Sequence, residues 1–292
     1  MGNAVHKIYV SFLLAIGLLS VVVISVKGGS YYATPLQERP FHPMYNALKP
    51  TGLYGQGFGV IGSLMITLGV IIYSSRKRMR SLANVGKIKY FLEFHIFLCL
   101  LGPILVVYHT TFKFGGLVAV SFWSMAAVVL SGIIGRYLYV QIPKGIQGNE
   151  LTITQLQSEN AKLAEMLSKQ FKLSADFVKW IDAIALPARE VATMSLLEVL
   201  NFFVISDVTR RAKLHAIFSR LEQRGLHAHV IHRLRAVAHR RMMLTRRIAF
   251  LQQFKLIFHY WHVVHLPFSI VMFLILFVHV GVAVAFGYTW IF

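Results

Sequence analysis

Five long apolar segments dominate the sequence and limit what the chain can fold into. Each has close to the roughly 20 residues that a helix needs to cross the hydrocarbon core of a bilayer. Because a bilayer offers the backbone no hydrogen-bond partners, an apolar segment of this length predicts a helix, which bonds internally. We therefore expect an all-α membrane protein whose five transmembrane helices form a bundle. The segments lie at residues 8–26, 57–75, 90–111, 117–140 and 256–285.

The composition agrees with this class, since 56% of the residues are hydrophobic and the mean hydropathy is +0.61. Lys and Arg number 30 against 11 Asp and Glu, which gives a formal net charge of +19. These cations flank the apolar segments, as topogenic charges do, so we expect membrane lipid and not nucleic acid as their partner. The single cysteine, Cys99, excludes an internal disulfide, an iron–sulfur site and a four-cysteine zinc site. No CxxCH motif is present, which excludes covalently attached c-type haem.

The placement of basic residues predicts the orientation of the helices. Lys and Arg crowd the loop at 76–89 and the long stretch at 144–255, so both are expected on the cytoplasmic side. The N-terminus is then cytoplasmic and the C-terminus periplasmic, in what we expect to be a bacterial inner membrane. The third and fifth segments consequently run in the same direction.

Three parts are predicted along the chain: helices one to four in 1–141, a cytoplasmic helical insertion in 142–254, and the fifth helix in 255–292. Within the insertion, leucines recur at helical spacing in 151–167, which indicates an amphipathic helix. Asp176 is expected to cap a second helix that ends before Pro187. The basic stretch 233–247 favours attraction to anionic lipid headgroups, with an acidic electron-transfer partner as the alternative.

Four histidines inside the apolar segments carry the strongest functional signal. Ionisable residues are costly in a membrane and are functional by default. His95 and His109 are 14 residues apart in the third segment, and His265 and His279 are 14 apart in the fifth. In a regular helix this spacing is about four turns less 40° and about 21 Å, so both rings of a pair lie near one face. Because the helices are predicted to be parallel, His95 is level with His265 (the inner pair), and His109 with His279 (the outer pair).

Two imidazoles at one depth can supply both axial ligands of a haem iron. The arrangement occurs twice, so we expect two b-type haems with bis-histidine iron ligation. Such haems have no open coordination position, which favours electron transfer over oxygen binding. Two alternatives stay open: a transporter whose histidines bind a metal or relay protons, and a structural membrane anchor subunit.

The inner ligand of the fifth segment has a rival. His262 is 17 residues from His279, about 100° from alignment in a regular helix, although a kink at Pro267 would alter this phase. We prefer His265 as the ligand and expect His262 to contact a haem propionate or a quinone. Arg136, at the inner end of the fourth segment, is a second candidate for a propionate. Glycines in 57–62, with Gly132 and Gly135, are expected to permit close approach of helices or of a macrocycle.

The stretch "WHVVHLPFSIVMFLILFVHV", in which His265 and His279 are the second and third histidines, resembles the ligand helix of a known group. The paired His-x13-His helices resemble cytochrome b of quinol–cytochrome c reductases. They are more similar to the transmembrane domain of ferric reductases and NADPH oxidases, whose ligands come from the third and fifth helices. This resemblance covers segments two to five and implies a two-haem transmembrane cytochrome.

The chain departs from those oxidases because no flavin- or nicotinamide-binding domain and no sixth helix follow the fifth segment. We therefore expect an electron-transfer subunit of an oxidoreductase complex. Its donor is expected to be a quinol or a cytoplasmic redox protein. Its acceptor is expected to be a periplasmic multihaem cytochrome or another redox subunit.

Overall fold

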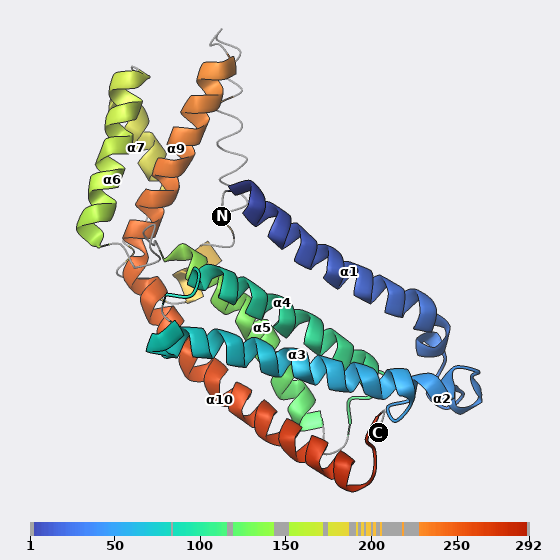
Figure 1. The fold of residues 1–292 in the computed structure, drawn as a ribbon. Helices are drawn as coiled ribbons and strands as arrows, with labels where there is room; N and C mark the ends of the chain where they lie inside the picture. Colours follow the sequence, from blue (N-terminus) through green and yellow to red (C-terminus); the bar gives the residue numbers. More distant parts are fainter. Residues whose placement is uncertain are drawn as a thin grey trace. The chain divides into compact units, whose positions relative to one another are not determined.

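The computed structural model describes residues 3–82, 84–115, 119–142, 152–171, 175–186 and 228–290, with single positions between 191 and 218. Within these residues all regular structure is helical, which confirms the predicted all-α class. Five helices are long and apolar enough to cross a membrane, one for each predicted segment, and the chain is an integral membrane protein. They are α1 (Asn3–Ala33), α3 (Leu53–Arg78), α4 (Ile88–His109), α5 (Ala119–Gln141) and α10 (Leu251–Ala285) (Figure 1).

Shorter elements complete the described chain. The loop between α1 and α3 contains η1 (Arg39–Phe41) and α2 (Tyr45–Leu48), and η2 (Arg80–Leu82) follows α3. Between α5 and α10 lie α6 (Ile153–Glu165), η3 (Met166–Gln170), α7 (Ala175–Ala185) and α9 (Ala228–Ala249).

The predicted amphipathic helix is α6, which begins with a capping box in which Thr152 and Gln155 exchange hydrogen bonds. Asp176 lies within the first turn of α7, which begins at Ala175, so the prediction that Asp176 caps this helix is wrong. A carboxylate in the first turn still interacts favourably with the N-terminal end of the helix dipole. The helix ends at Ala185, before Pro187, as predicted. Most of residues 187–227 lie outside the described part of the chain.

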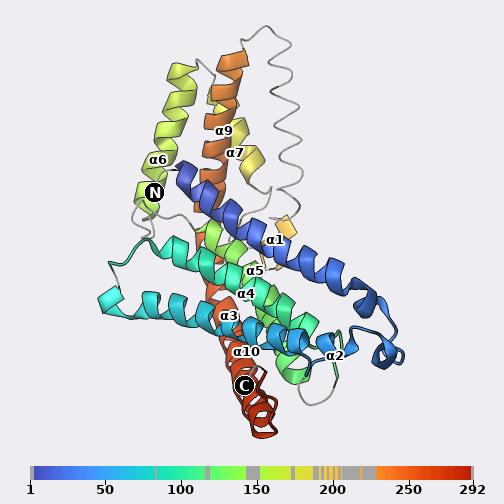
Figure 2. The same cartoon turned by 45° about the vertical axis from the view of Figure 1, so that its right-hand side comes forward.

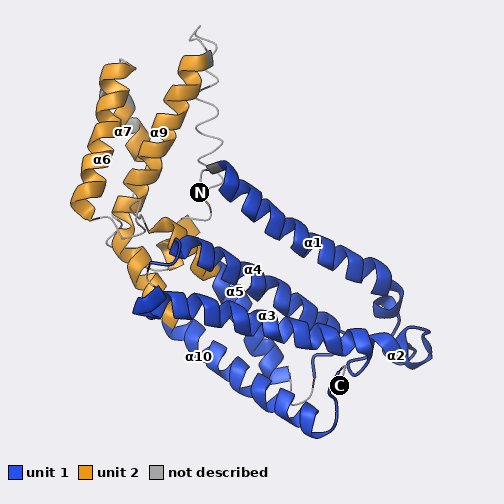
Figure 3. Ribbon diagram, in the orientation of Figure 1, with its two compact units in different colours: residues 1–133, 263–292 blue, residues 134–262 orange. Residues whose placement is uncertain are grey.

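The chain divides into two compact units (Figure 3). Unit 1 comprises residues 1–133 and 263–292, and unit 2 comprises residues 134–262. Both divisions fall inside a helix, one in α5 and the other in α10.

Within unit 1, α3 and α4 lie side by side, as both ribbon views show (Figures 1 and 2). One face of α3 is almost free of side chains, and this glycine face is buried against α4. At its centre, a Cβ added to Gly62 would lie 2.7 Å from the carbonyl oxygen of Gly102, closer than real Cβ atoms come. The expectation that glycines allow close helix approach is confirmed for this pair. The face consists of Gly55, Gly59, Gly62, Ile66 and Gly69.

The other helices of unit 1 pack less tightly. Met272 of α10 lies with Ile66 of α3 and Met125 of α5 in a small buried core. The hydroxyl of Ser121 on α5 donates to the carbonyl oxygen of Met272 at 3.2 Å. Much of the remaining apolar surface of α1 and α10 is exposed, as expected for sides that meet lipid.

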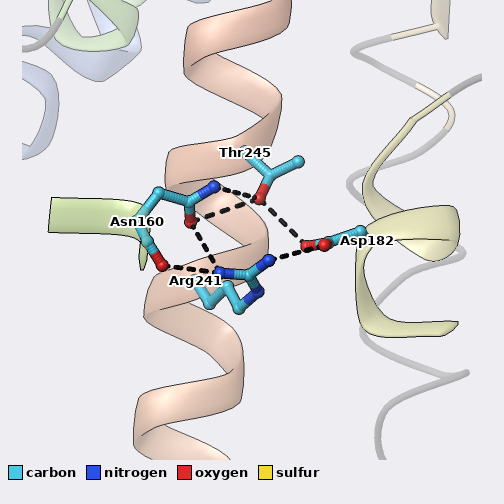
Figure 4. Close-up of polar contacts among 4 residues, drawn as sticks. All are labelled: Asn160, Asp182, Arg241 and Thr245. Atoms are coloured by element: carbon cyan, nitrogen blue, oxygen red, sulfur yellow. Dashed lines mark hydrogen bonds and ion pairs between the residues drawn. The ribbon is translucent and has the colours of Figure 1, made fainter. Parts of the chain in front are cut away.

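Unit 2 contains a buried polar network that joins α6, α7 and α9 (Figure 4). The guanidinium of Arg241, which is 8% exposed, donates to Asp182 Oδ2 at 2.6 Å and to the carbonyl oxygen of Asn160 at 2.5 Å. The hydroxyl of Thr245 donates to Asp182 Oδ1 at 3.1 Å. Arg246, on the same helix, is also buried, at 1% exposure. Part of the basic stretch 233–247 therefore faces the interior of unit 2 and is not a free cationic surface.

Candidate functional site

The two histidines of α10 in unit 1 share the less exposed side of that helix. His265, Ser269, Met272, Leu276 and His279 follow one another at intervals of three or four residues, and all are at least partly buried. The helix continues without interruption through Pro267, so the predicted phase between His265 and His279 is kept.

His262 precedes His265 by three residues on α10 and is exposed. Its Nδ1 bonds to the carbonyl oxygen of Phe258, one turn earlier in the same helix, at 2.9 Å. Its ring also stands perpendicular to that of Phe258, with centroids 4.6 Å apart. Its interaction with a propionate or a quinone stays a prediction.

Both histidines of α4 bond to the backbone of α3. His95 Nδ1 lies 3.0 Å from the carbonyl oxygen of Gly69, and His109 Nδ1 lies 2.9 Å from that of Gly55. A carbonyl oxygen only accepts hydrogen bonds, so in each ring Nδ1 carries the proton and Nε2 keeps its lone pair. Nε2 is thereby left as the atom that can coordinate a metal.

The glycine face of α3 makes these bonds possible. A Cβ added to Gly59 would lie 2.7 Å from His109 Nδ1, so any larger residue there meets the ring. At the other end of the face, the Tyr73 ring lies against His95 with centroids 5.2 Å apart. Cys99 Sγ is 3.6 Å from His95 Nδ1 and is mostly buried, in keeping with a packing role.

His265 has an equivalent partner on α5. Its Nδ1 lies 2.6 Å from the hydroxyl oxygen of Ser131. The same hydroxyl lies 2.9 Å from the carbonyl oxygen of Val128, and when it donates there it accepts from Nδ1–H of the imidazole. That arrangement places the proton of His265 on Nδ1, as in the two rings of α4. The ring also lies close to Gly132, whose added Cβ would be 3.9 Å from Cε1.

His279 of α10 lies within electrostatic range of His109 of α4. Within the described residues, no hydrogen bond is found for His279.

The contacts of α10 also define its direction. Met272 is level with Ile66, which contacts Gly102 of α4, and His279 is close to His109. Met272 precedes His279 by 7 residues, and Gly102 precedes His109 by the same number. The two helices therefore run in the same direction, as the charge distribution predicted. Met272 also follows His265 by 7 residues, and Gly102 follows His95 by 7. His265 and His95 therefore lie at the same level of the two parallel helices.

Arg136 lies in unit 2, where its guanidinium lies over the ring of Tyr139, 5.8 Å from the centroid. Its assignment to a haem propionate stays a prediction.

Three of the four rings are bonded in the manner of metal-bound histidines. Metal-bound histidines characteristically donate their second ring N–H to an oxygen acceptor, which fixes the ring and strengthens its donation to the metal. His95, His109 and His265 each have such an acceptor in place. Among the described residues, no group of three or more His, Cys, Asp or Glu side chains is arranged to hold a bare metal ion.

Sequence reasoning missed the acceptors Gly55, Gly69 and Ser131. A signal for the glycines was present, since Gly55 and Gly69 are 14 residues apart, the same interval as between the histidines they bond. Nothing in the sequence singled out Ser131, which is one of several serines in its helix.

No protein-family model, curated protein or solved structure matches this chain.

Proposed function

We propose that this chain is a cytochrome subunit that carries electrons across the membrane on two b-type haems. His95 and His265 hold the inner haem, and His109 and His279 hold the outer one. The observation that carries the proposal is that three of these rings each have Nδ1 bonded to an oxygen atom of a neighbouring helix, as metal-bound histidines characteristically do.

Bound haem supplies one-electron chemistry at the iron. The chain's own residues decide what that chemistry can be used for. Two histidines would hold each iron, and a haem held in this way would supply electron transfer and would leave no position for oxygen. The helices α4, α5 and α10 are predominantly apolar, and exclusion of water is one of the factors that set a haem potential.

A transporter for metal ions is supported less well. A bare transition-metal ion held by two imidazoles needs further ligands from the chain, and cation pathways usually contain acidic residues. Glu93 is the one acidic residue in the span of α4, and it forms ion pairs with His6 and Lys89 at 3.6 and 3.7 Å.

The proposal includes redox partners on both sides of the membrane. The electron donor is a quinol or a cytoplasmic protein, and the electron acceptor is a periplasmic redox subunit.

The visible spectrum of the purified full chain tests the proposal. Dithionite should give reduced b-type bands, and a pyridine haemochrome assay should give two haems per chain. A colourless protein, or one that accumulates metal in haem-free vesicles, would contradict it. Unchanged function after replacement of all four histidines would point instead to a structural anchor.

Single substitutions test the pairing. His95→Ala and His265→Ala should each remove the same haem, and His109→Ala and His279→Ala the other, because each iron loses one axial ligand. His262→Ala is the matched control from the same helix and should keep both haems, since that ring is exposed and its Nδ1 is bonded to the carbonyl oxygen of Phe258 in its own helix. Loss of different haems from His95→Ala and His265→Ala would show that the pairing is wrong.

A further inference from the structure

The four candidate ligands do not have equivalent surroundings. His95 and His109 donate to backbone carbonyl oxygens. These oxygens belong to the main chain and remain whichever side chain the acceptor residue has. His265 donates to a side chain, the hydroxyl of Ser131, at 2.6 Å. His279 has no hydrogen bond within the described residues. Ser131 is thus the side-chain acceptor among these contacts, and it serves a ring of the inner pair.

Ser131 is itself held in place. Its hydroxyl also lies 2.9 Å from the carbonyl oxygen of Val128, one turn earlier in α5, and donation to that oxygen directs a hydroxyl lone pair to His265. The ring also lies beside Gly132, where an added Cβ would make an ordinary contact with its Cε1 at 3.9 Å. The serine therefore fixes both the tautomer of His265 and the rotation of its ring.

We propose that Ser131 is the positioning residue that sets the redox potential of the inner haem independently of the outer one. This inference rests on the proposed function. A hydrogen bond accepted from Nδ1–H raises the basicity of the ring at Nε2, and a stronger donor favours ferric over ferrous iron. Ser131 consequently holds the inner potential lower than His265 alone would give.

The test is a redox titration of the purified two-haem protein, followed in the visible spectrum and by the EPR signals of the ferric haems. The titration of His95→Ala, which lacks the inner haem, assigns each signal to a site. In Ser131→Ala the midpoint potential of the inner haem should move to more positive values and its EPR signal should shift. The outer haem is expected to keep its potential and its signal.

Two further variants at position 131 keep the test interpretable if Ser131→Ala loses haem. Ser131→Thr retains a hydroxyl and should restore the wild-type potential. Ser131→Cys retains the size of the side chain with a weaker acceptor and should give a smaller shift in the same direction.

Ser121→Ala is the matched control, because Ser121 also joins α5 to α10, but through the carbonyl oxygen of Met272 and not through a candidate ligand. It should move neither potential. An equal shift of both haems in Ser131→Ala, the same shift in Ser121→Ala, or no shift of the inner haem would overturn the inference. Absence of haem from the wild-type protein would instead refute the proposed function, so the two failures are distinguishable.

Discussion

At the scale of single residues, Gly59 shows how closely α3 and α4 are fitted. A methyl group on this residue would lie 2.7 Å from His109 Nδ1 and would displace the ring from the carbonyl oxygen of Gly55. Losing such a supporting contact typically weakens metal binding about 10- to 100-fold. Gly59→Ala should therefore lower the haem content from two per chain towards one, measured by pyridine haemochrome assay, with loss confined to the outer haem.

Gly29→Ala is the control for that substitution. Gly29 also lies in a long apolar helix, but a Cβ there would meet nothing within 4 Å. Its haem content should equal that of the wild type. Retention of both haems in Gly59→Ala would mean that the contact between His109 and α3 does not support the ligand.

At the scale of elements, the segment after α10 turns back onto the beginning of α3. Gly287, with φ of +82°, makes the turn. The indole N–H of Trp290 then donates to the carbonyl oxygen of Leu53 at 2.8 Å, and Gln56 Nε2 donates to the carbonyl oxygen of Tyr288 at 2.7 Å. The segment thereby ties the end of α10 that contains His279 to the end of α3 that contains Gly55.

Trp290→Phe keeps an aromatic ring but removes the hydrogen bond to Leu53. The contact between the C-terminal segment and α3 should therefore lose about 1 kcal/mol of stabilising free energy. The expected result is a broader EPR signal of the outer haem, since the orientation of His279 becomes less uniform. Trp123→Phe is the comparison, because Trp123 is 58% exposed on α5. Identical spectra for the wild type and Trp290→Phe would show that α10 is held by other contacts.

At the scale of the whole molecule, the polar network of unit 2 is expected to matter for stability and not for the haems. Asp182→Ala leaves the guanidinium of Arg241 without its carboxylate in a site where that arginine is 8% exposed. Breaking a buried pair from one side costs about 3–5 kcal/mol. Circular dichroism should show helix loss at a lower temperature, while the visible spectrum is unchanged because the network contacts residues of unit 2.

Glu165→Ala provides the comparison for Asp182→Ala. Glu165 also forms an ion pair, with Lys169 at 2.7 Å, but both side chains are exposed, at 59% and 78%. Water screens such pairs, so the unfolding temperature should stay close to that of the wild type. Equal destabilisation by the two variants would contradict a structural role for the buried network.

Much of this architecture follows from the sequence, because a bilayer restricts the backbone so strongly. Apolar length predicted all five long helices, and the placement of Lys and Arg predicted that α4 and α10 run in the same direction. The 14-residue interval selected His95, His109, His265 and His279 because helical periodicity is a local property. The cap assigned to Asp176 was wrong, since the start of α7 depends on a shift of one or two residues.

The tertiary structure decided what surrounds the four rings. Ser131 bonds to His265 across 134 positions of the sequence, and only the packing of α5 beside α10 creates that contact. Gly55 and Gly69 become acceptors because α4 lies against the bare face of α3, where their carbonyl oxygens are within reach of a side chain. Periodicity along one helix places residues on a face, but it does not determine which atoms of another helix meet that face. The sequence alone therefore predicts which histidines share a helix face, whereas the hydrogen-bond partners of their rings depend on the tertiary structure.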